Sequence, residues 1–237
     1  PTIVCLDEKA AILHYHAKRS TGSGRVLLLD AGASDHGYGC DITRTSVARD
    51  VNPRFKALAA ALNTLQLRLC AMVKAGGSYV EIHLAAHREI GELLIEQGVL
   101  KCALDEAIEK RFTSAFFPHG VGHHLGIQVH DIGGHQEARE GGTLAPPEGH
   151  PYLRNTRLMD VGHVFTIEPG LYCRAVGGIR FKLTRQWFRA PTTHYRQFDS
   201  LTGRRWWEKH YGPAPEGQAL ASVRYRPAQV TSLNTVY

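Results

Sequence analysis

The stretch PHGVGHHLGIQVHD, residues 118–131, contains four histidines separated by glycines. His119 and His123 are four residues apart, a spacing that places two metal ligands on one face of a helix in zinc sites. Two glycines fall between them, and each glycine inside a helix costs about 1 kcal/mol relative to alanine. We therefore expect an extended chain, in which His119 and His123 share one face while His124 points the other way as a structural residue.

Three carboxylates elsewhere in the chain occupy apolar surroundings. Asp30 ends the run VLLL, Asp41 lies in GCDITRT, and Glu168 lies in FTIEPG. Burial of a carboxylate is costly unless the group is paired or binds a metal. The alternatives are structural: one aspartate caps a turn while the other pairs with Arg44, and Glu168 is an edge-strand acid.

Together, these residue types predict a metal-dependent hydrolase. Two or three carboxylates with one imidazole suit Mn²⁺, Co²⁺ or Zn²⁺ better than a metal that prefers thiolates. Carboxylates can bridge two ions, and a two-metal site activates a water and polarises a carbonyl. Further histidines, such as His130 beside Asp131, could then donate to an oxyanion or shuttle protons.

The elements that must position these groups form an α+β pattern. We expect strands at residues 2–6, 10–15, 25–32, 37–47 and 163–170, the third and fourth forming a hairpin around the turn ASDHG. Helices are expected from Pro53 to a stop at Gly76, from a capping box at Ser78 and Glu81 to about Gln97, and more weakly over 104–111. A polar, proline-rich loop follows residue 136.

Composition narrows the class of protein. The chain has 237 residues, 43% of them hydrophobic, and includes no apolar run of about 20 residues that would span a membrane. Five cysteines without a close pair indicate reduced thiols in the cytoplasm. From residue 173 onward, 11 Lys and Arg oppose 3 Asp and Glu, a net +8, so residues 1–172 carry −2 of the overall +6. The first 172 residues thus give no reason to expect nucleic-acid binding.

Three ordered motifs resemble those of a known family. DAG…GCDITRT, FFPHGVGHHLGIQVHD and FTIEPG are similar to motifs of the pita-bread metallopeptidases, the prolidase and aminopeptidase P group, closest to bacterial Xaa-Pro dipeptidases and organophosphorus acid anhydrolases. APPEGHPYLRNTR is typical of that subgroup. The resemblance covers roughly residues 1–172. Methionine aminopeptidases share the fold but fit the motifs less well, and creatinases lack the two aspartates.

The resemblance implies a curved antiparallel sheet covered by helices, with a two-metal site, usually Mn²⁺ with Co²⁺ or Zn²⁺ as alternatives, in the concavity of the sheet. A metal-bridging hydroxide would attack the Xaa-Pro bond of a dipeptide, with organophosphorus esters as a side substrate. It also implies a homodimer and a preceding N-terminal domain that this chain lacks. The implied metal ligands are Asp30, Asp41, His123 and Glu168, and the implied substrate-binding residues are His14, His119, His130 and Arg180, with His119, His130 and Glu168 catalytic.

The last part of the chain departs from the family pattern. After GGIR the family has a bridging glutamate, where this chain has Lys182 in GGIRFKLT. An ammonium beside two cations is repulsive. We therefore treat residues 1–172 as the catalytic domain and 173–237 as an anomalous basic, Trp-rich segment, with a shifted reading frame, a divergent replacement or a genuine basic extension as explanations. Two alternatives to an active hydrolase remain. The chain is a catalytically inert member of the family, or it is a binding module that uses the basic segment to contact nucleic acid or acidic partners.

Overall fold

The computed structural model describes residues 2–12, 14–15 and 22–172. A three-stranded antiparallel sheet carries the N-terminal part, with β1 (Ile3–Leu6), β2 (Val26–Ala31) and β5 (Ile42–Val47) in the order β1-β2-β5. The expected pairing of β2 with β5 is confirmed. β2 is buried on one face only, because Leu27 and Leu29 remain 38% and 42% exposed.

The connection between β2 and β5 contains a small hairpin of its own. β3 (Ser34–Asp35) pairs with β4 (Tyr38–Gly39). The two residues between them, His36 and Gly37, have φ angles of 49° and 86°. Positive φ at both central residues is the geometry that matches the twist of two short strands. The turn expected over ASDHG is therefore this hairpin tip.

One expected strand is wrong. Residues 10–15 were expected to be extended, but the chain forms a 3-10 helix at η1 (Asp7–Ala11) immediately after β1. Asp7 has a φ of 49°, and its Oδ1 accepts hydrogen bonds of 2.9 Å from the backbone N–H groups of Arg25 and Val26. These bonds turn the chain at Asp7, and Ala10 packs into a small core with Ile3, Cys5 and Leu28.

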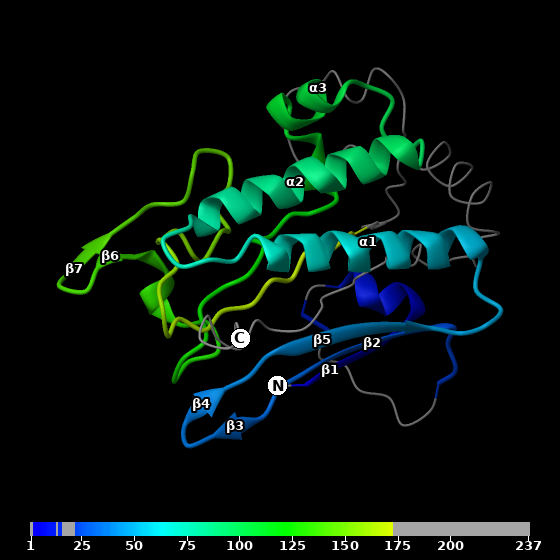
Figure 1. Ribbon diagram of the computed structural model, residues 1–237. Helices are drawn as coiled ribbons and strands as arrows, with labels where there is room; N and C mark the ends of the chain where they lie inside the picture. The colour runs from blue at the N-terminus through cyan, green and yellow to red at the C-terminus, as the bar shows by residue number, and fades with distance from the viewer. Residues whose placement is uncertain (1, 13, 16–21, 173–237) are drawn as a thin grey trace.

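Two long helices cover the sheet (Figure 1). α1 (Pro53–Ala71) lies between the sheet and α2 (Tyr79–Glu96), and α3 (Leu104–Glu109) packs on the far side of α2. All three helices were expected within a few residues of these bounds. The Oγ of Ser78 accepts the Glu81 N–H at 3.3 Å, so the expected N-terminal cap of α2 is present.

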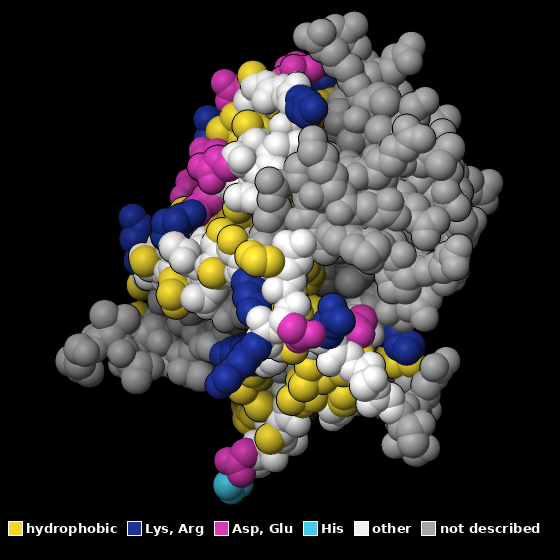
Figure 2. All heavy atoms as spheres, turned by 90° about the vertical axis from the view of Figure 1, so that its right-hand side faces the viewer, with side chains coloured by type: hydrophobic (Ala, Val, Ile, Leu, Met, Phe, Trp, Pro, Cys, Tyr) yellow, Lys and Arg dark blue, Asp and Glu magenta, His cyan; other side chains and the backbone are white. Residues whose placement is uncertain are grey.

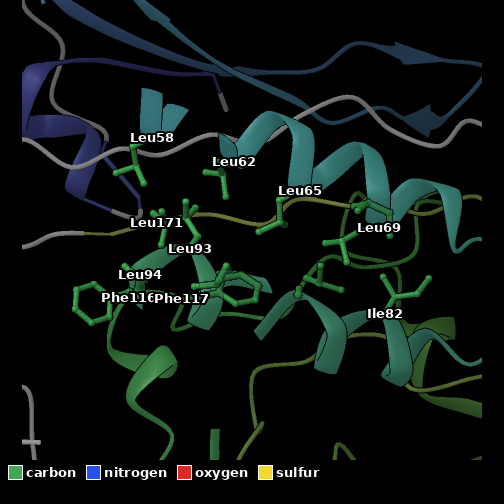
Figure 3. Packing of buried hydrophobic residues seen from close by; sticks show 14 of the residues in the cluster. Leu58, Leu62, Leu65, Leu69, Ile82, Leu93, Leu94, Phe116, Phe117 and Leu171 are labelled. Carbon is green, nitrogen blue, oxygen red and sulfur yellow. The ribbon is translucent and has the colours of Figure 1, made fainter. Parts of the chain in front are cut away.

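The main hydrophobic core lies between α1 and α2. Leucines spaced three and four residues apart on α1 form one stripe, which faces the apolar side of α2 (Figure 3). Phe116 and Phe117, from the segment after α3, and Leu171 pack around the same helices. The labelled members are Leu58, Leu62, Leu65, Leu69, Ile82, Leu93, Leu94, Phe116, Phe117 and Leu171.

Residues 121–125 and 164–168 run antiparallel, side by side. Backbone N–H groups of residues 125, 166 and 168 donate to the carbonyl groups of residues 164, 123 and 121 in turn. The expected strand at 163–170 is therefore extended and paired, although its regular ladder is limited to one bridge, His124 with Phe165. The remaining elements are short: η2 (Phe112–Ala115), η3 (Ile132–His135), β6 (Gln136–Ala138) and β7 (Gly141–Thr143).

The surface of the described residues is mixed in character. On the face shown in Figure 2, hydrophobic side chains lie among both basic and acidic ones. Within the described ranges, every helix is too short or too polar to cross a membrane. The cysteines in these ranges, at positions 5, 40, 70 and 102, are free thiols.

Candidate metal centre

His123 lies between two carboxylates that come from distant parts of the sequence. Its Nε2 is 3.2 Å from Oδ2 of Asp41 and 3.3 Å from Oε1 of Glu168. The three side chains are 3%, 13% and 8% exposed, so solvent screens their charges little. One imidazole nitrogen and two carboxylate oxygens therefore lie close together in a buried position.

The tautomer of His123 determines what this point can hold. Its Nδ1 lies 2.9 Å from the carbonyl oxygen of His124, and because a carbonyl only accepts, Nδ1 carries the hydrogen. In the neutral ring, Nε2 then presents a lone pair to two anionic oxygens. Burial lowers the pKa of His123, but the hydrogen bond to Asp41 and the charge of Glu168 outweigh it and raise the pKa overall. The geometry thus calls for a cation at Nε2, either a proton or a metal ion, and this donor set fits a divalent ion.

Glu168 is held in place by a buried hydroxyl. The Oγ1 of Thr166 donates to Glu168 Oε1 at 2.9 Å and accepts the backbone N–H of His123 at 3.1 Å. The backbone N–H of Glu168 donates to the carbonyl of Val121 at 2.6 Å, and the hydroxyl of Tyr79 donates to the carbonyl of Thr166 at 2.6 Å. Both extended segments are thereby fixed to each other and to α2, as the orientation of a metal ligand requires.

Asp30 lies in β2, and Asp41 directly precedes β5 at the same end of the strand pair. Asp30 pairs with Thr43 in the β2–β5 register, and Asp41 precedes Thr43 by two residues. Cross-strand partners share a face of the sheet, so the side chains of Asp30 and Thr43 lie on the same face. Thr43 is buried on this face, and Ile42 on the other is 41% exposed. Asp41 lies beside His123, whereas the place of Asp30 in the same site stays a prediction.

His130 completes a group with Asp41 and His123 whose ligand atoms all lie within 4.8 Å of one another. Its ring stands nearly perpendicular to that of His123, with centroids 4.3 Å apart. Partial burial, together with His123 and Arg154, lowers the pKa of His130 to about 4 despite nearby carboxylates. Near neutral pH its ring is uncharged and exposed, so it can donate or accept a hydrogen bond.

His119 lies beside the chain that continues from Glu168. Its Nδ1 donates to the carbonyl of Gly120 at 2.7 Å, and its ring contacts Tyr172 edge-on with centroids 5.3 Å apart. A Cβ at Gly170 would come within 3.2 Å of His119 Nε2. A larger residue at position 170 would therefore require the rings of His119 and Tyr172 to shift slightly.

Other candidates from the sequence do not join this group in the described structure. His124 turns away and stacks against His163, with ring centroids 4.9 Å apart, and burial lowers its pKa to about 4. His14 is exposed. Arg180 and Lys182 lie outside the described residues, so their roles stay predictions.

Two features of the structure were not predicted from the sequence. Thr166 binds both His123 and Glu168, and its position two residues before Glu168, on the same face, was the available signal. His83, His87 and His150 form a second cluster, with ligand atoms within 4.8 Å of one another. The spacing of four between His83 and His87 on a helix was the signal there.

Comparisons with known proteins identify the family of the chain. The profile of Peptidase_M24, metallopeptidase family M24, matches residues 1–184. Over 172 residues, 72% of this chain, the sequence is 46% identical to an Xaa-Pro dipeptidase of Stenotrophomonas maltophilia (strain R551-3) and 48% identical to one of Shewanella frigidimarina (strain NCIMB 400). In each case it spans 39% of the relative's length.

Solved structures give the same result for the fold. Aminopeptidase P from Escherichia coli with the inhibitor Pro-Leu superposes with a TM-score of 0.59 at 30% identity, covering 72% of this chain and 36% of that one. Aminopeptidase PepP of Pseudomonas aeruginosa superposes with a TM-score of 0.62 at 23% identity, covering 98% of this chain and 44% of that one. The fold of the described residues is the α+β pita-bread type expected from the motifs. With its family profile and its relatives in agreement, the chain belongs to metallopeptidase family M24.

Proposed function

We propose that this chain is the catalytic part of a metal-dependent dipeptidase that cleaves the peptide bond before proline. The observation that carries the proposal is the position of His123 Nε2, which faces Asp41 and Glu168 at 3.2 and 3.3 Å with its other nitrogen committed to a backbone carbonyl. The curated relatives named Xaa-Pro dipeptidase support the substrate class, and this chain spans about two fifths of their length.

In this proposal Asp30, Asp41, His123 and Glu168 hold two divalent ions, manganese being preferred over cobalt or zinc for an oxygen-rich set. When bound, the ions supply an activated water and polarise the scissile carbonyl. Zinc-substituted aminopeptidase P from E. coli in complex with product shows that a structural neighbour accepts zinc.

The protein's own residues would then handle the substrate and the protons. His130, uncharged near neutral pH and partly exposed, can donate a hydrogen bond to the oxyanion that forms as the carbonyl is attacked. His119, beside Gly170, is placed to bind the substrate near the end of the Glu168 segment. His14 and Arg180 are proposed to contact the substrate, and the full-length protein is proposed to be a cytoplasmic homodimer.

The test is metal binding and hydrolysis by the same chain. After exhaustive dialysis against chelator, titration calorimetry with Mn²⁺ is expected to show two equivalents per chain, and a dipeptide ending in proline is expected to be cleaved. D41N, which keeps the size of the side chain but removes its charge, is expected to lose most of the metal affinity. L84A, on the solvent side of α2, is the control variant expected to bind normally.

Other results would support rival functions. Metal binding without hydrolysis would identify an inert member, as the lysine at position 182 favours. Absence of metal binding in the unsubstituted chain would refute the proposal. The same preparation assayed with an organophosphorus ester would show whether that side activity is present, and salt-dependent DNA or RNA retention would indicate a binding module.

A further inference from the structure

A second histidine cluster lies outside the candidate metal centre. His83 and His87 project from α2 and are 1% and 4% exposed, and His150 reaches them from the loop that follows β7. The ring centroid of His83 lies 4.7 Å from the ring centroid of His87 and 4.7 Å from that of His150. Such a cluster suggests a metal site, but its hydrogen bonds indicate a different role.

The tautomer of His83 follows from its backbone partner. The N–H of Val121 donates to His83 Nδ1 at 3.3 Å, and because an amide N–H only donates, this nitrogen must be the acceptor. The pKa of His83 is lowered to about 2, first by burial and then by His87, His150 and His119, so the ring is neutral. Its hydrogen is therefore on Nε2, which donates to Nδ1 of His150 at 2.9 Å. Both nitrogens of His83 are engaged, and neither offers a free lone pair to a metal ion.

This chain of hydrogen bonds continues to the candidate metal ligands. The carbonyl of Val121 accepts the backbone N–H of Glu168 at 2.6 Å, and Val121 lies two residues before His123. The peptide groups at Val121 thus connect His83 on one side with Glu168 on the other. A shift of this backbone would move Glu168 relative to His123.

We propose that His83, through the hydrogen bond that its Nδ1 accepts from Val121, is a positioning residue that sets the backbone at Val121 and so the spacing of Glu168 and His123 around the metal. His87 serves as an internal comparison: it is equally buried one helical turn away, but its Nδ1 bonds to the hydroxyl of Thr113 and not to the Val121 segment. The inference rests on the proposed metal-dependent function where Mn²⁺ affinity is measured. Amide hydrogen exchange tests the positioning role without any metal.

The experiment compares three variants of the full chain. H83L and H87L each replace one buried imidazole by an apolar side chain. In H83N the Oδ1 atom takes the place of Nδ1, so it can still accept the Val121 N–H although the bond to His150 is lost. Amide hydrogen exchange at Val121 and Glu168 in metal-free protein and Mn²⁺ affinity by calorimetry are measured for each.

H83L is expected to accelerate exchange at both amides and to weaken Mn²⁺ binding about tenfold, the lower end of the effect of removing an outer-shell partner. H83N is expected to restore both, and H87L to change neither, whatever the loss of thermal stability. Equal behaviour of H83L and H87L, or a failure of H83N to rescue, would overturn the inference. So would Zn²⁺ binding that persists in H123A and disappears in H87L, because the cluster would then be a metal site. If the unsubstituted chain binds no Mn²⁺, the proposed function fails, while the exchange data still test the positioning role.

Discussion

The buried histidines of α2 should make the stability of this protein depend on pH. Burial is the main cause that lowers the pKa of His87, from 6.5 to about 3, and the neighbouring His150 lowers it further. Between these values the unfolded chain binds a proton at this position and the folded chain does not. The free energy of unfolding therefore falls as the pH drops below 6.5 and continues to fall until about pH 3.

The magnitude follows from the two pKa values. For a group that titrates at 6.5 when unfolded and stays neutral when folded, lowering the pH from about 7 to about 5 costs about 2 kcal/mol at 25 °C. Replacing His87 by leucine removes this contribution. H87L should therefore lose about 2 kcal/mol less stability than the unsubstituted chain over this range, whatever its stability at pH 7.

Urea unfolding followed by circular dichroism, in chelator at both pH values, measures the difference. I90V is the control: Ile90 is fully buried on the same helix, and its change costs about 0.5–1.5 kcal/mol without adding or removing a titrating group. If H87L and the unsubstituted chain lose the same free energy between the two pH values, His87 is already protonated in the folded protein at the lower pH. That result would refute the burial argument.

Three further predictions concern hydrogen bonding and packing within the chain. T166V leaves the His123 N–H without its acceptor, so it should cost about 1–3 kcal/mol of stability and lower the Mn²⁺ affinity about 10–100-fold. T166S keeps the hydroxyl and should stay close to the unsubstituted chain, both in urea denaturation and in calorimetry. G122A puts a Cβ against the carbonyl oxygen of Thr166 and should destabilise the chain more than G162A does. A Cβ at position 162 meets open space, so G162A should cost only about 1–2 kcal/mol for its left-handed backbone. Equal melting temperatures of the two variants would contradict the clash at position 122. L62A, in the fully buried stripe of α1, should cost about 2–5 kcal/mol in urea unfolding, and a smaller loss would mean that the helices close the cavity.

Local sequence patterns predicted most of the secondary structure. The three helices and the β2–β5 pair follow from apolar spacing and capping residues, which act within a few residues of each other. The strand expected at residues 10–15 failed because the chain turns at Asp7, whose carboxylate binds backbone groups nearly twenty residues later. No local pattern contains that contact.

The sequence by itself determined which residues could form the candidate site. Acidic residues in apolar surroundings and histidines among glycines stood out by type. Only the tertiary structure decided how they meet. It brought His123 within 3.3 Å of carboxylates from two other segments, assigned its tautomer through the carbonyl of His124, and connected Glu168 through Val121 to His83 on α2. These relations depend on distances between segments far apart in the chain, and such distances arise only when the helices and the sheet pack together.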